Sequence, residues 1–340
     1  FNHQIFIMHG QGHRMLGNYD QAERALRTCL TYHPYFPNTY NNLGHLYEVQ
    51  NKNERAVQFY YKALELLPKH YKAHYNLGIV FKKMAQIDSA IAAYHRAILF
   101  QGDFTKSYLN LGAIHMDLGQ PDSAIAYYNK ALSGYAPTIE AYFNLGEAYS
   151  EQHQFEKAVE AYSLFLTNWK GNPQYEQSAR DGLSAAFNGL GLQAEQQSRF
   201  DQALEFYQYA LHYWPDNALY WYNLGNAYRG KKDWKNAIES YKTSLQKNDT
   251  ETNTYNNLGL THMDLNDLPR AIEAYQKALR INPESPLVHF NIGSAYLKSG
   301  NAKAAVLAYR KFLSIWQGDP EMAKQVRSLL SQLGENSQDL

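Results

Sequence analysis

Apolar residues recur along the chain in paired stripes, and a short polar segment separates the two stripes of each pair. Within a stripe the spacing is three or four residues, which is typical of one face of an α-helix, so each pair predicts a helical hairpin. One hairpin cannot bury its apolar face alone, whereas stacked hairpins share a continuous core. The pattern therefore predicts an all-α solenoid of stacked hairpins rather than two globular domains.

Small residues mark the hairpins at a regular interval. The first marker is a glycine, which occurs in nine copies of the pattern. Seven of the eight intervals between consecutive marker glycines have the length of the interval from Gly44 to Gly78, and the interval from Gly146 to Gly191 is longer. The nine glycines are Gly10, Gly44, Gly78, Gly112, Gly146, Gly191, Gly225, Gly259 and Gly293. An alanine stands at position i+12 from each marker glycine, and in eight copies a tyrosine stands at i+16. The glycine and alanine indicate where two helices approach too closely for larger side chains.

These markers resemble the tetratricopeptide repeat family. Copy two carries the whole family pattern, with Tyr40, Leu43, Gly44, Tyr47, Ala56, Tyr60, Ala63 and Pro68. Cys29, Phe165 and Phe312 depart from it at the position that Ala63 holds in copy two. The resemblance covers residues 3–319 and implies an all-α, right-handed α-α superhelical solenoid of nine helical hairpins, here with a C-terminal capping helix.

The longer step divides the predicted array. We expect hairpins one to five over residues 3–165 and hairpins six to nine over residues 184–319. Residues 166–183 contain the 11 additional residues, which make about three helical turns and could lengthen the first helix of hairpin six without rotating its buried face. Pro173 is the expected start of that helix. The alternative is a loop, because Gly171, Asn172 and Gly182 disfavour a helix.

The two ends of the chain differ in their patterns. Residues 320–334 are predicted to form a capping helix that turns Met322, Val326, Leu329 and Leu330 toward hairpin nine, and residues 335–340 a flexible tail. The N-terminal end is more apolar than a terminal repeat needs, with Phe1, Ile5, Phe6, Ile7 and Met8. Neither a start methionine nor a signal-like segment precedes it. We therefore expect a piece of a longer or processed polypeptide, with an upstream segment or a partner covering this face.

Composition excludes several classes of function. Lys+Arg and Asp+Glu both number 32, which disfavours a protein that binds nucleic acid through charge. No apolar run of about 18 residues is present, so no membrane insertion by this chain is expected. The single cysteine excludes an internal disulfide framework and a cysteine-based zinc cluster. The compartment stays open between a cytoplasmic and a periplasmic location.

No catalytic motif is present. The chain lacks a nucleophile elbow, a phosphate-binding loop, a dinucleotide-binding glycine motif and a zinc-protease motif, so we expect no enzyme and no cofactor. Two histidine pairs have the i, i+4 spacing of a metal site, His9/His13 and His70/His74. Packing is favoured for both pairs, because the first occupies core repeat positions and His70 precedes the helix that carries His74. We therefore expect no metal.

Seven copies carry an asparagine two positions before the marker glycine, here called the ladder asparagines: Asn42, Asn76, Asn110, Asn144, Asn223, Asn257 and Asn291. The resemblance implies that the first helices line a concave surface, where these residues would form an inner ladder. A carboxamide offers both a donor and an acceptor, which suits the backbone of an extended peptide. We predict that they bind peptide; the alternative is that they brace the neighbouring helix. Copy six lacks the asparagine, so two binding segments are expected.

Three functions remain open. The favoured one is a non-catalytic protein–protein interaction scaffold that binds an extended peptide or a partner helix in its concave groove. The second is the substrate-engaging repeat region of a larger enzyme, such as a glycosyltransferase or a membrane glycan ligase, whose catalytic part is absent from this chain. The third is a solenoid that self-associates through its exposed first repeat. Clamping of a chaperone's C-terminal carboxylate is disfavoured, because no three consecutive copies carry the lysine, asparagine and arginine pattern.

Overall fold

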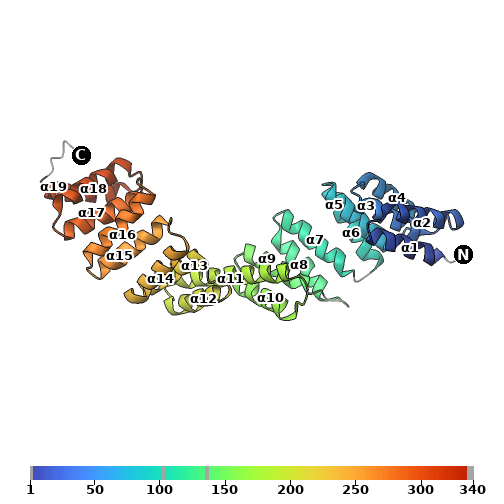
Figure 1. Cartoon of the computed structure of the whole chain (residues 1–340), viewed down its shortest axis with the longest axis horizontal. Helices are drawn as coiled ribbons and strands as arrows, with labels where there is room; N and C mark the ends of the chain where they lie inside the picture. Colours follow the sequence, from blue (N-terminus) through green and yellow to red (C-terminus); the bar gives the residue numbers. More distant parts are fainter. Residues whose placement is uncertain (1–2, 102–103, 135–137, 335–340) are drawn as a thin grey trace. The chain divides into compact units, whose positions relative to one another are not determined.

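The computed structural model describes residues 3–101, 104–134 and 138–334, so the predicted tail at 335–340 lies outside the described residues (Figure 1). The described residues form 19 α-helices and contain no strand. They fall into two compact units, unit 1 at Phe1–Gly171 and unit 2 at Asn172–Leu340. None of the described helices combines the length and the apolar character needed to cross a bilayer.

Unit 1 contains ten helices: α1 (His3–Met15), α2 (Tyr19–Tyr32), α3 (Pro37–Val49), α4 (Asn53–Leu66), α5 (Tyr71–Lys83), α6 (Ile87–Phe100), α7 (Thr105–Asp117), α8 (Pro121–Leu132), α9 (Glu140–Glu151) and α10 (Phe155–Asn168). Unit 2 contains nine: α11 (Pro173–Gln196), α12 (Phe200–Tyr213), α13 (Ala218–Gly230), α14 (Trp234–Lys247), α15 (Thr252–Asp264), α16 (Leu268–Ile281), α17 (Pro286–Lys298), α18 (Ala302–Ile315) and α19 (Pro320–Gln332).

Each odd-numbered helix from α1 to α17 packs against the even-numbered helix that follows it, and α19 packs against α18. The described residues thus form nine helical hairpins and a capping helix, five hairpins in unit 1 and four in unit 2. This confirms the all-α hairpin array predicted from the sequence. The right-handed superhelix stays a prediction.

The marker residues hold each hairpin together as the spacing predicted. All nine marker alanines are fully buried, and so is Tyr60 in hairpin two. A Cβ atom added to Gly44 would lie 2.6 Å from the ring of Tyr60, and the other tyrosine-containing hairpins show the same clash. In hairpin one the corresponding Cβ would lie 2.7 Å from Leu26 Cγ. Glycine is needed at these positions because the second helix presses a large side chain onto the backbone of the first.

The turn after each first helix uses the same backbone conformation in all nine hairpins. The residue seven positions after the marker glycine has a positive φ, at Gly17, Asn51, Ala85, Gly119, His153, Ser198, Lys232, Asn266 and Gly300. This left-handed residue ends the helix, as in a Schellman motif: next to Asn51, the Lys52 N–H donates to the Tyr47 carbonyl at 2.9 Å. Only three of the nine positions are glycine; asparagine tolerates this conformation at two more, and the remaining four, Ala85, His153, Ser198 and Lys232, are strained.

Residues Pro173–Gln196 form one continuous helix, α11, rather than a loop followed by a helix. Its start is well specified, because Pro173 occupies the first turn and the Asn172 side chain accepts a hydrogen bond from the Gln174 N–H at 2.8 Å. Gly182 lies inside the helix without interrupting it.

A second, longer period relates the two units. Each of hairpins two to five corresponds to one of hairpins six to nine, in order. The number of residues between corresponding positions is constant and equals the separation of Gly44 and Gly191; we call it the unit offset. The correspondence continues beyond the hairpins. Phe165, Trp169, Gly171 and Pro173 recur with this unit offset as Phe312, Trp316, Gly318 and Pro320. Each phenylalanine is fully buried and stacks on its tryptophan, with ring centroids 5.0 and 5.1 Å apart.

The unit offset gives the 11 additional residues a structural meaning. The first half of α11 precedes α19 by the unit offset, so that Ala179 and Leu183 correspond to Val326 and Leu330. All four side chains are buried, and the latter two pack on Tyr309 and Phe312. The segment that the repeat count presents as an insertion is therefore the counterpart of the capping helix.

Candidate peptide-binding surface

The first helices of successive hairpins lie closer together than the second helices in the part of the chain that the structure describes. Those of successive hairpins touch one another, at α1–α3, α3–α5 and α7–α9 in unit 1 and at α11–α13, α13–α15 and α15–α17 in unit 2. No contact of similar extent joins two second helices in the part of the chain that the structure describes. The side on which the first helices touch one another is here called the first-helix face.

Five ladder asparagines are hydrogen-bonded to the preceding hairpin. In each case the Nδ2 atom donates to the residue at position i−35, on the previous first helix. The pairs are Asn76 to Asn41 (3.0 Å), Asn110 to Tyr75 (3.3 Å), Asn223 to Asn188 (2.8 Å), Asn257 to Tyr222 (3.0 Å) and Asn291 to Asn256 (2.8 Å). We call each such bond a rung. Rungs brace neighbouring hairpins, as the alternative interpretation of these residues anticipated.

The two remaining ladder asparagines have no rung because the residue at position i−35 is apolar. For Asn42 this residue is Ile7, and the Asn42 Oδ1 atom accepts a hydrogen bond from Gln11 Nε2 at 3.1 Å instead. For Asn144 it is Leu109, and the half-buried carboxamide of Asn144 makes no hydrogen bond with a described residue. Whether an asparagine braces the array thus depends on its partner position, which the sequence pattern did not include.

Burial separates the ladder asparagines further. Asn223 is only 4% exposed and its acceptor Asn188 only 9%, whereas the other six are half-buried. Copy six, which lacks a ladder asparagine, still contributes Asn188 to a rung. In unit 2 the rungs therefore run through hairpins six to nine without interruption.

A second series of contacts with the same spacing lies about two turns further along the first helices. Lys82 Nζ is 2.9 Å from Asp117 Oδ2, and its counterpart Arg229 Nη2 is 3.3 Å from Asp264 Oδ2. In unit 1, Lys83 Nζ also contacts Glu48 Oε1 at 2.8 Å. Each of these pairs has the spacing of a rung and joins consecutive hairpins.

Glu48 is the most buried carboxylate on this face, at 5% exposure. It accepts hydrogen bonds from Tyr60 Oη at 3.0 Å and Lys83 Nζ at 2.8 Å, and it lies 3.1 Å from His45 Nδ1. Burial by itself raises its pKa, but the hydrogen bonds from His45 and Lys83 and the charge of Lys83 outweigh burial and lower the pKa to about 2. Glu48 is therefore ionised at neutral pH.

The counterpart of Glu48 in unit 2 behaves in the opposite way. Glu195 accepts a hydrogen bond from Tyr207 Oη at 2.8 Å, as Glu48 does from Tyr60. Leu192 and Gly230 replace His45 and Lys83, however, and burial raises the pKa of Glu195. The neighbours of the two carboxylates thus set opposite shifts: His45 and Lys83 lower the pKa of Glu48, whereas burial raises the pKa of Glu195 despite the hydrogen bond from Tyr207.

A cleft of about 470 Å³ opens between the first helices α13 and α15. Trp214, Leu219 and Tyr222 line one side, and Asn253 and Thr254 the other. Trp214 and Leu219 are 42% and 56% exposed, respectively, so an apolar wall meets solvent beside the rung from Asn257 to Tyr222. This cleft offers an apolar contact next to a carboxamide on the first-helix face of unit 2.

The histidine pairs are placed differently from each other. His70 Nδ1 accepts from the Ala73 N–H at 3.2 Å and His74 Nε2 lies 2.9 Å from the Pro68 carbonyl, so both serve the local helix start. The prediction that His9 occupies a core position is wrong, because its side chain is exposed on the face of α1 that no described hairpin covers. Groups of three or more metal-binding side chains are absent from the described residues.

Comparison with known proteins gives matches to repeat models and to a solved structure. Models described as tetratricopeptide repeat match residues 37–70, 71–103, 103–164, 188–251 and 287–315, and one described as TPR repeat matches 261–300. No curated protein matches the chain. A solved structure described as "Functional Characterization of Pseudomonas Aeruginosa pilF" is 18% identical with a TM-score of 0.48, and the match covers 63% of this chain and 92% of the other.

The repeat matches take in hairpins two to nine, the same hairpins in which a marker glycine is packed against a tyrosine. Sequence period, hairpin geometry and repeat models thus agree along the chain. The chain belongs to the tetratricopeptide repeat family.

Proposed function

We propose that this chain is a non-catalytic scaffold that holds an extended peptide against the first-helix face of each unit. Tetratricopeptide repeats form protein-interaction domains, which supports the general assignment. The observation that carries the more specific proposal is the row of carboxamides on touching first helices. The rungs use Nδ2 donors, whereas Oδ1 of Asn76 and of Asn110 accepts no hydrogen bond from a described residue.

This arrangement restricts what the ladder recognises. A carboxamide whose donor is occupied presents mainly an acceptor, so it would receive N–H groups of a peptide backbone. The Asn144 carboxamide makes no hydrogen bond with a described residue, so it would contact both an N–H and a carbonyl group of the peptide. Backbone groups are common to all peptides, so the ladder would contribute affinity, while side-chain clefts such as the one between α13 and α15 would contribute specificity.

Paired variants separate ligand binding from bracing. Asn110→Ala removes both the rung and the proposed ligand contact, whereas Tyr75→Phe removes only the rung acceptor and keeps Asn110 in place. In a titration with a peptide library, Asn110→Ala should weaken binding about two- to tenfold, the equivalent of one hydrogen bond, and Tyr75→Phe should not. The triple variant of Asn76, Asn110 and Asn144 should lose far more and nearly equally for unrelated peptides.

The corresponding variants in unit 2 provide an internal control. Asn257→Ala and Tyr222→Phe give the related comparison one unit later, where Asn257 Nδ2 also donates to Asn226 Oδ1 at 2.9 Å and Asn257 Oδ1 accepts from Asn256 Nδ2 at 3.4 Å. If all the asparagine variants bind every peptide as the wild type does while the protein remains folded, the ladder has only a structural role and the proposal is wrong.

Self-association through hairpin one is a second candidate, favoured by its exposed apolar side chains. Ile5, Met8, Met15 and Leu16 are 52%, 69%, 79% and 75% exposed. Light scattering should then give a mass above that of one chain at micromolar concentration, and Ile5→Ser with Met8→Ser should restore the monomer. A monomeric wild type would exclude this candidate.

A further inference from the structure

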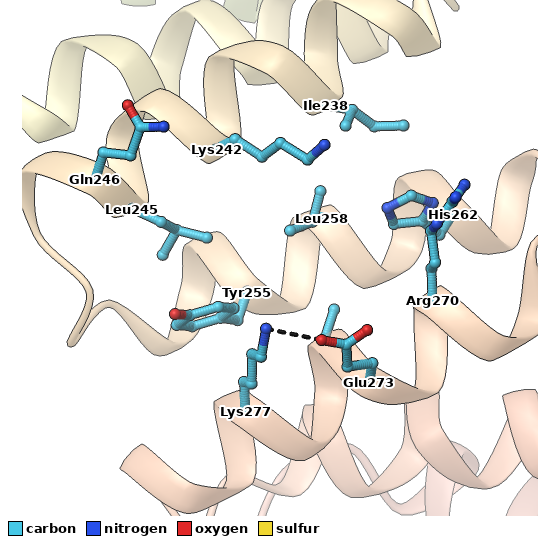
Figure 2. Close-up of a pocket in the computed structure, with 11 residues that line it drawn as sticks. Ile238, Lys242, Leu245, Gln246, Tyr255, Leu258, His262, Arg270, Glu273 and Lys277 are labelled. Atoms are coloured by element: carbon cyan, nitrogen blue, oxygen red, sulfur yellow. Dashed lines mark ion pairs between the residues drawn. The ribbon is translucent and has the colours of Figure 1, made fainter.

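The second helices of unit 2 are separated by a series of clefts on the side opposite the ladder. Clefts of about 450, 620 and 650 Å³ lie between α12 and α14, α14 and α16, and α16 and α18. The first helix between each pair forms the floor. In the middle cleft, here called the α14–α16 cleft, α14 contributes Ile238, Lys242, Leu245 and Gln246, α15 contributes Tyr255, Leu258 and His262, and α16 contributes Arg270, Glu273, Ala274 and Lys277 (Figure 2).

The unit offset identifies the counterpart of this cleft in unit 1, between α6 and α8. Three lining residues have identical counterparts, namely Tyr108 for Tyr255, His115 for His262 and Lys130 for Lys277, and His95 stands at the position of Lys242. The apolar floor also corresponds, with Leu111 for Leu258. One position differs in size, because Tyr127 stands where the α14–α16 cleft has Ala274.

Tyr127 fills the cleft of unit 1. Its ring stacks on His115, with centroids 5.2 Å apart and an interplanar angle of 18°. Tyr127 Oη lies 3.3 Å from His95 Nε2, and Lys130 Nζ lies 5.4 Å from the ring centroid. Tyr108 also stacks beside the ring, with centroids 6.5 Å apart, so three residues that recur in unit 2, together with His95, surround this tyrosine.

Hairpin two shows the same arrangement a second time. Phe59, at the position of Tyr127, stacks on Tyr47 with centroids 5.2 Å apart and an interplanar angle of 6°. Lys62, at the position of Lys130, places its Nζ 5.7 Å from the Phe59 centroid. A ring held between the aromatic residue of the first helix and a lysine of the second helix is therefore a recurrent feature of this chain.

The α14–α16 cleft has these surroundings but not the ring. Ala274 is small, and Lys242 makes no ion pair with a described residue. Lys277 pairs with Glu273 at 2.8 Å, and Arg270 with Asp267 at 2.9 Å. His262 is 6% exposed, and its buried Nδ1 has no hydrogen-bond partner, the nearest carboxylate being Asp267 Oδ2 at 3.5 Å. In Figure 2 the side chains of Lys242, Tyr255, His262 and Lys277 surround the open space.

We propose that the α14–α16 cleft receives a tyrosine side chain of a partner protein, in the place that Tyr127 occupies in unit 1. The ring would stack on His262 beside Tyr255, with Lys277 near its face and its hydroxyl oxygen accepting a hydrogen bond from Lys242. Lys242 stands at the position of His95, and this lysine favours tyrosine over phenylalanine. A bound phenylalanine would desolvate the Lys242 ammonium group without giving it an oxygen to bond, whereas the tyrosine hydroxyl supplies one. The site lies on the outer face, so it is independent of the ladder.

The direct probe is N-acetyltyrosinamide added to the full chain, with the His262 Cε1–H resonance observed by NMR and assigned by its loss in His262→Gln. One side chain supplies few contacts, so a dissociation constant of roughly millimolar is expected. The resonance should shift saturably through the ring current of the probe, and N-acetylalaninamide should leave it unchanged. The phenylalanine analogue should bind several-fold more weakly.

Two reciprocal substitutions complete the test. Ala274→Tyr should fill the cleft from within and abolish the shift, and Tyr127→Ala should open the unit 1 cleft and create a second saturable shift at His115. The wild-type titration decides the question even if Ala274→Tyr does not fold. An unchanged His262 resonance in the wild type, or an equal shift in folded Ala274→Tyr, would overturn the proposal.

Discussion

The two units carry the same series of rungs and differ at the third. Asn76 with Asn41 and Asn110 with Tyr75 in unit 1 match Asn223 with Asn188 and Asn257 with Tyr222 in unit 2. At the third position Asn291 bonds to Asn256, whereas Asn144 faces a leucine and has no rung. The difference shows that a repeated asparagine does not have one role: its partner position on the preceding first helix decides whether it braces the array or stays free.

The largest expected effect concerns the buried rung of unit 2. Asn223→Ala removes the donor to Asn188 and leaves a nearly buried carboxamide oxygen without a partner, which should cost about 2 kcal/mol of stability. The equivalent Asn76→Ala in unit 1 should cost less, because solvent reaches its half-buried site. Chemical denaturation followed by circular dichroism measures both. Equal losses of stability in the two variants would show that burial does not make the first rung of unit 2 more stabilising than the first rung of unit 1.

The pair of Glu48 and Glu195 predicts opposite responses to acid. The pKa of Glu48 is lowered to about 2, so its contribution to stability is complete above about pH 4.5 and is lost as the pH falls toward 2. The pKa of Glu195 is raised, so its unfavourable contribution appears only as the pH rises above about 4.5. Acidification should therefore remove the stabilising contribution of Glu48 and also remove the destabilising contribution of Glu195.

Lys83→Met tests this comparison. It should raise the pKa of Glu48 and cost about 1 kcal/mol at pH 7, a modest value because Lys83 is 42% exposed and its charge is screened by solvent. Conversely, Leu192→His, which copies His45, should lower the pKa of Glu195. Carboxyl chemical shifts measured against pH report both. If neither pKa moves, the difference between the units does not come from these neighbours.

A smaller effect is expected at the turns after the first helices, where corresponding residues of the two units share the same strain. Ala85 and its counterpart Lys232 have φ values of +58° and +62°. Ala85→Gly and Lys232→Gly should each stabilise by about 0.5–1 kcal/mol, because glycine adopts positive φ without a Cβ clash. Thermal denaturation measures the change. Substitution of Gly119 by alanine should have the opposite sign.

The hairpin array could be predicted from the sequence because glycine, alanine and tyrosine occupy positions where close packing permits little else. The correspondence between the first half of α11 and α19 was missed, although the recurrence of Phe165, Trp169, Gly171 and Pro173 as Phe312, Trp316, Gly318 and Pro320 was readable in the sequence. The period of the marker glycines alone presents that segment as an insertion.

The candidate site was only partly predictable. The positions of Asn76 and Asn291 on the first helices follow from the period, but their bonds depend on Asn41 and Asn256 in the preceding hairpin. The contrast between Glu48 and Glu195 likewise depends on His45 and Lys83, which meet Glu48 only when two hairpins stack. To predict contacts between repeats, one must know how neighbouring hairpins are aligned in the stack as well as the pattern within one repeat.

The most direct test of the account compares Asn291→Ala with Asn144→Ala. The two asparagines occupy corresponding positions in the two units, but only Asn291 makes a rung. We expect Asn291→Ala to lower the free energy of unfolding by about 1 kcal/mol, the value of its bond to Asn256, and Asn144→Ala to change it by less than about 0.5 kcal/mol. Equal destabilisation by the two substitutions would contradict the claim that the partner position on the preceding first helix sets the role of each ladder asparagine.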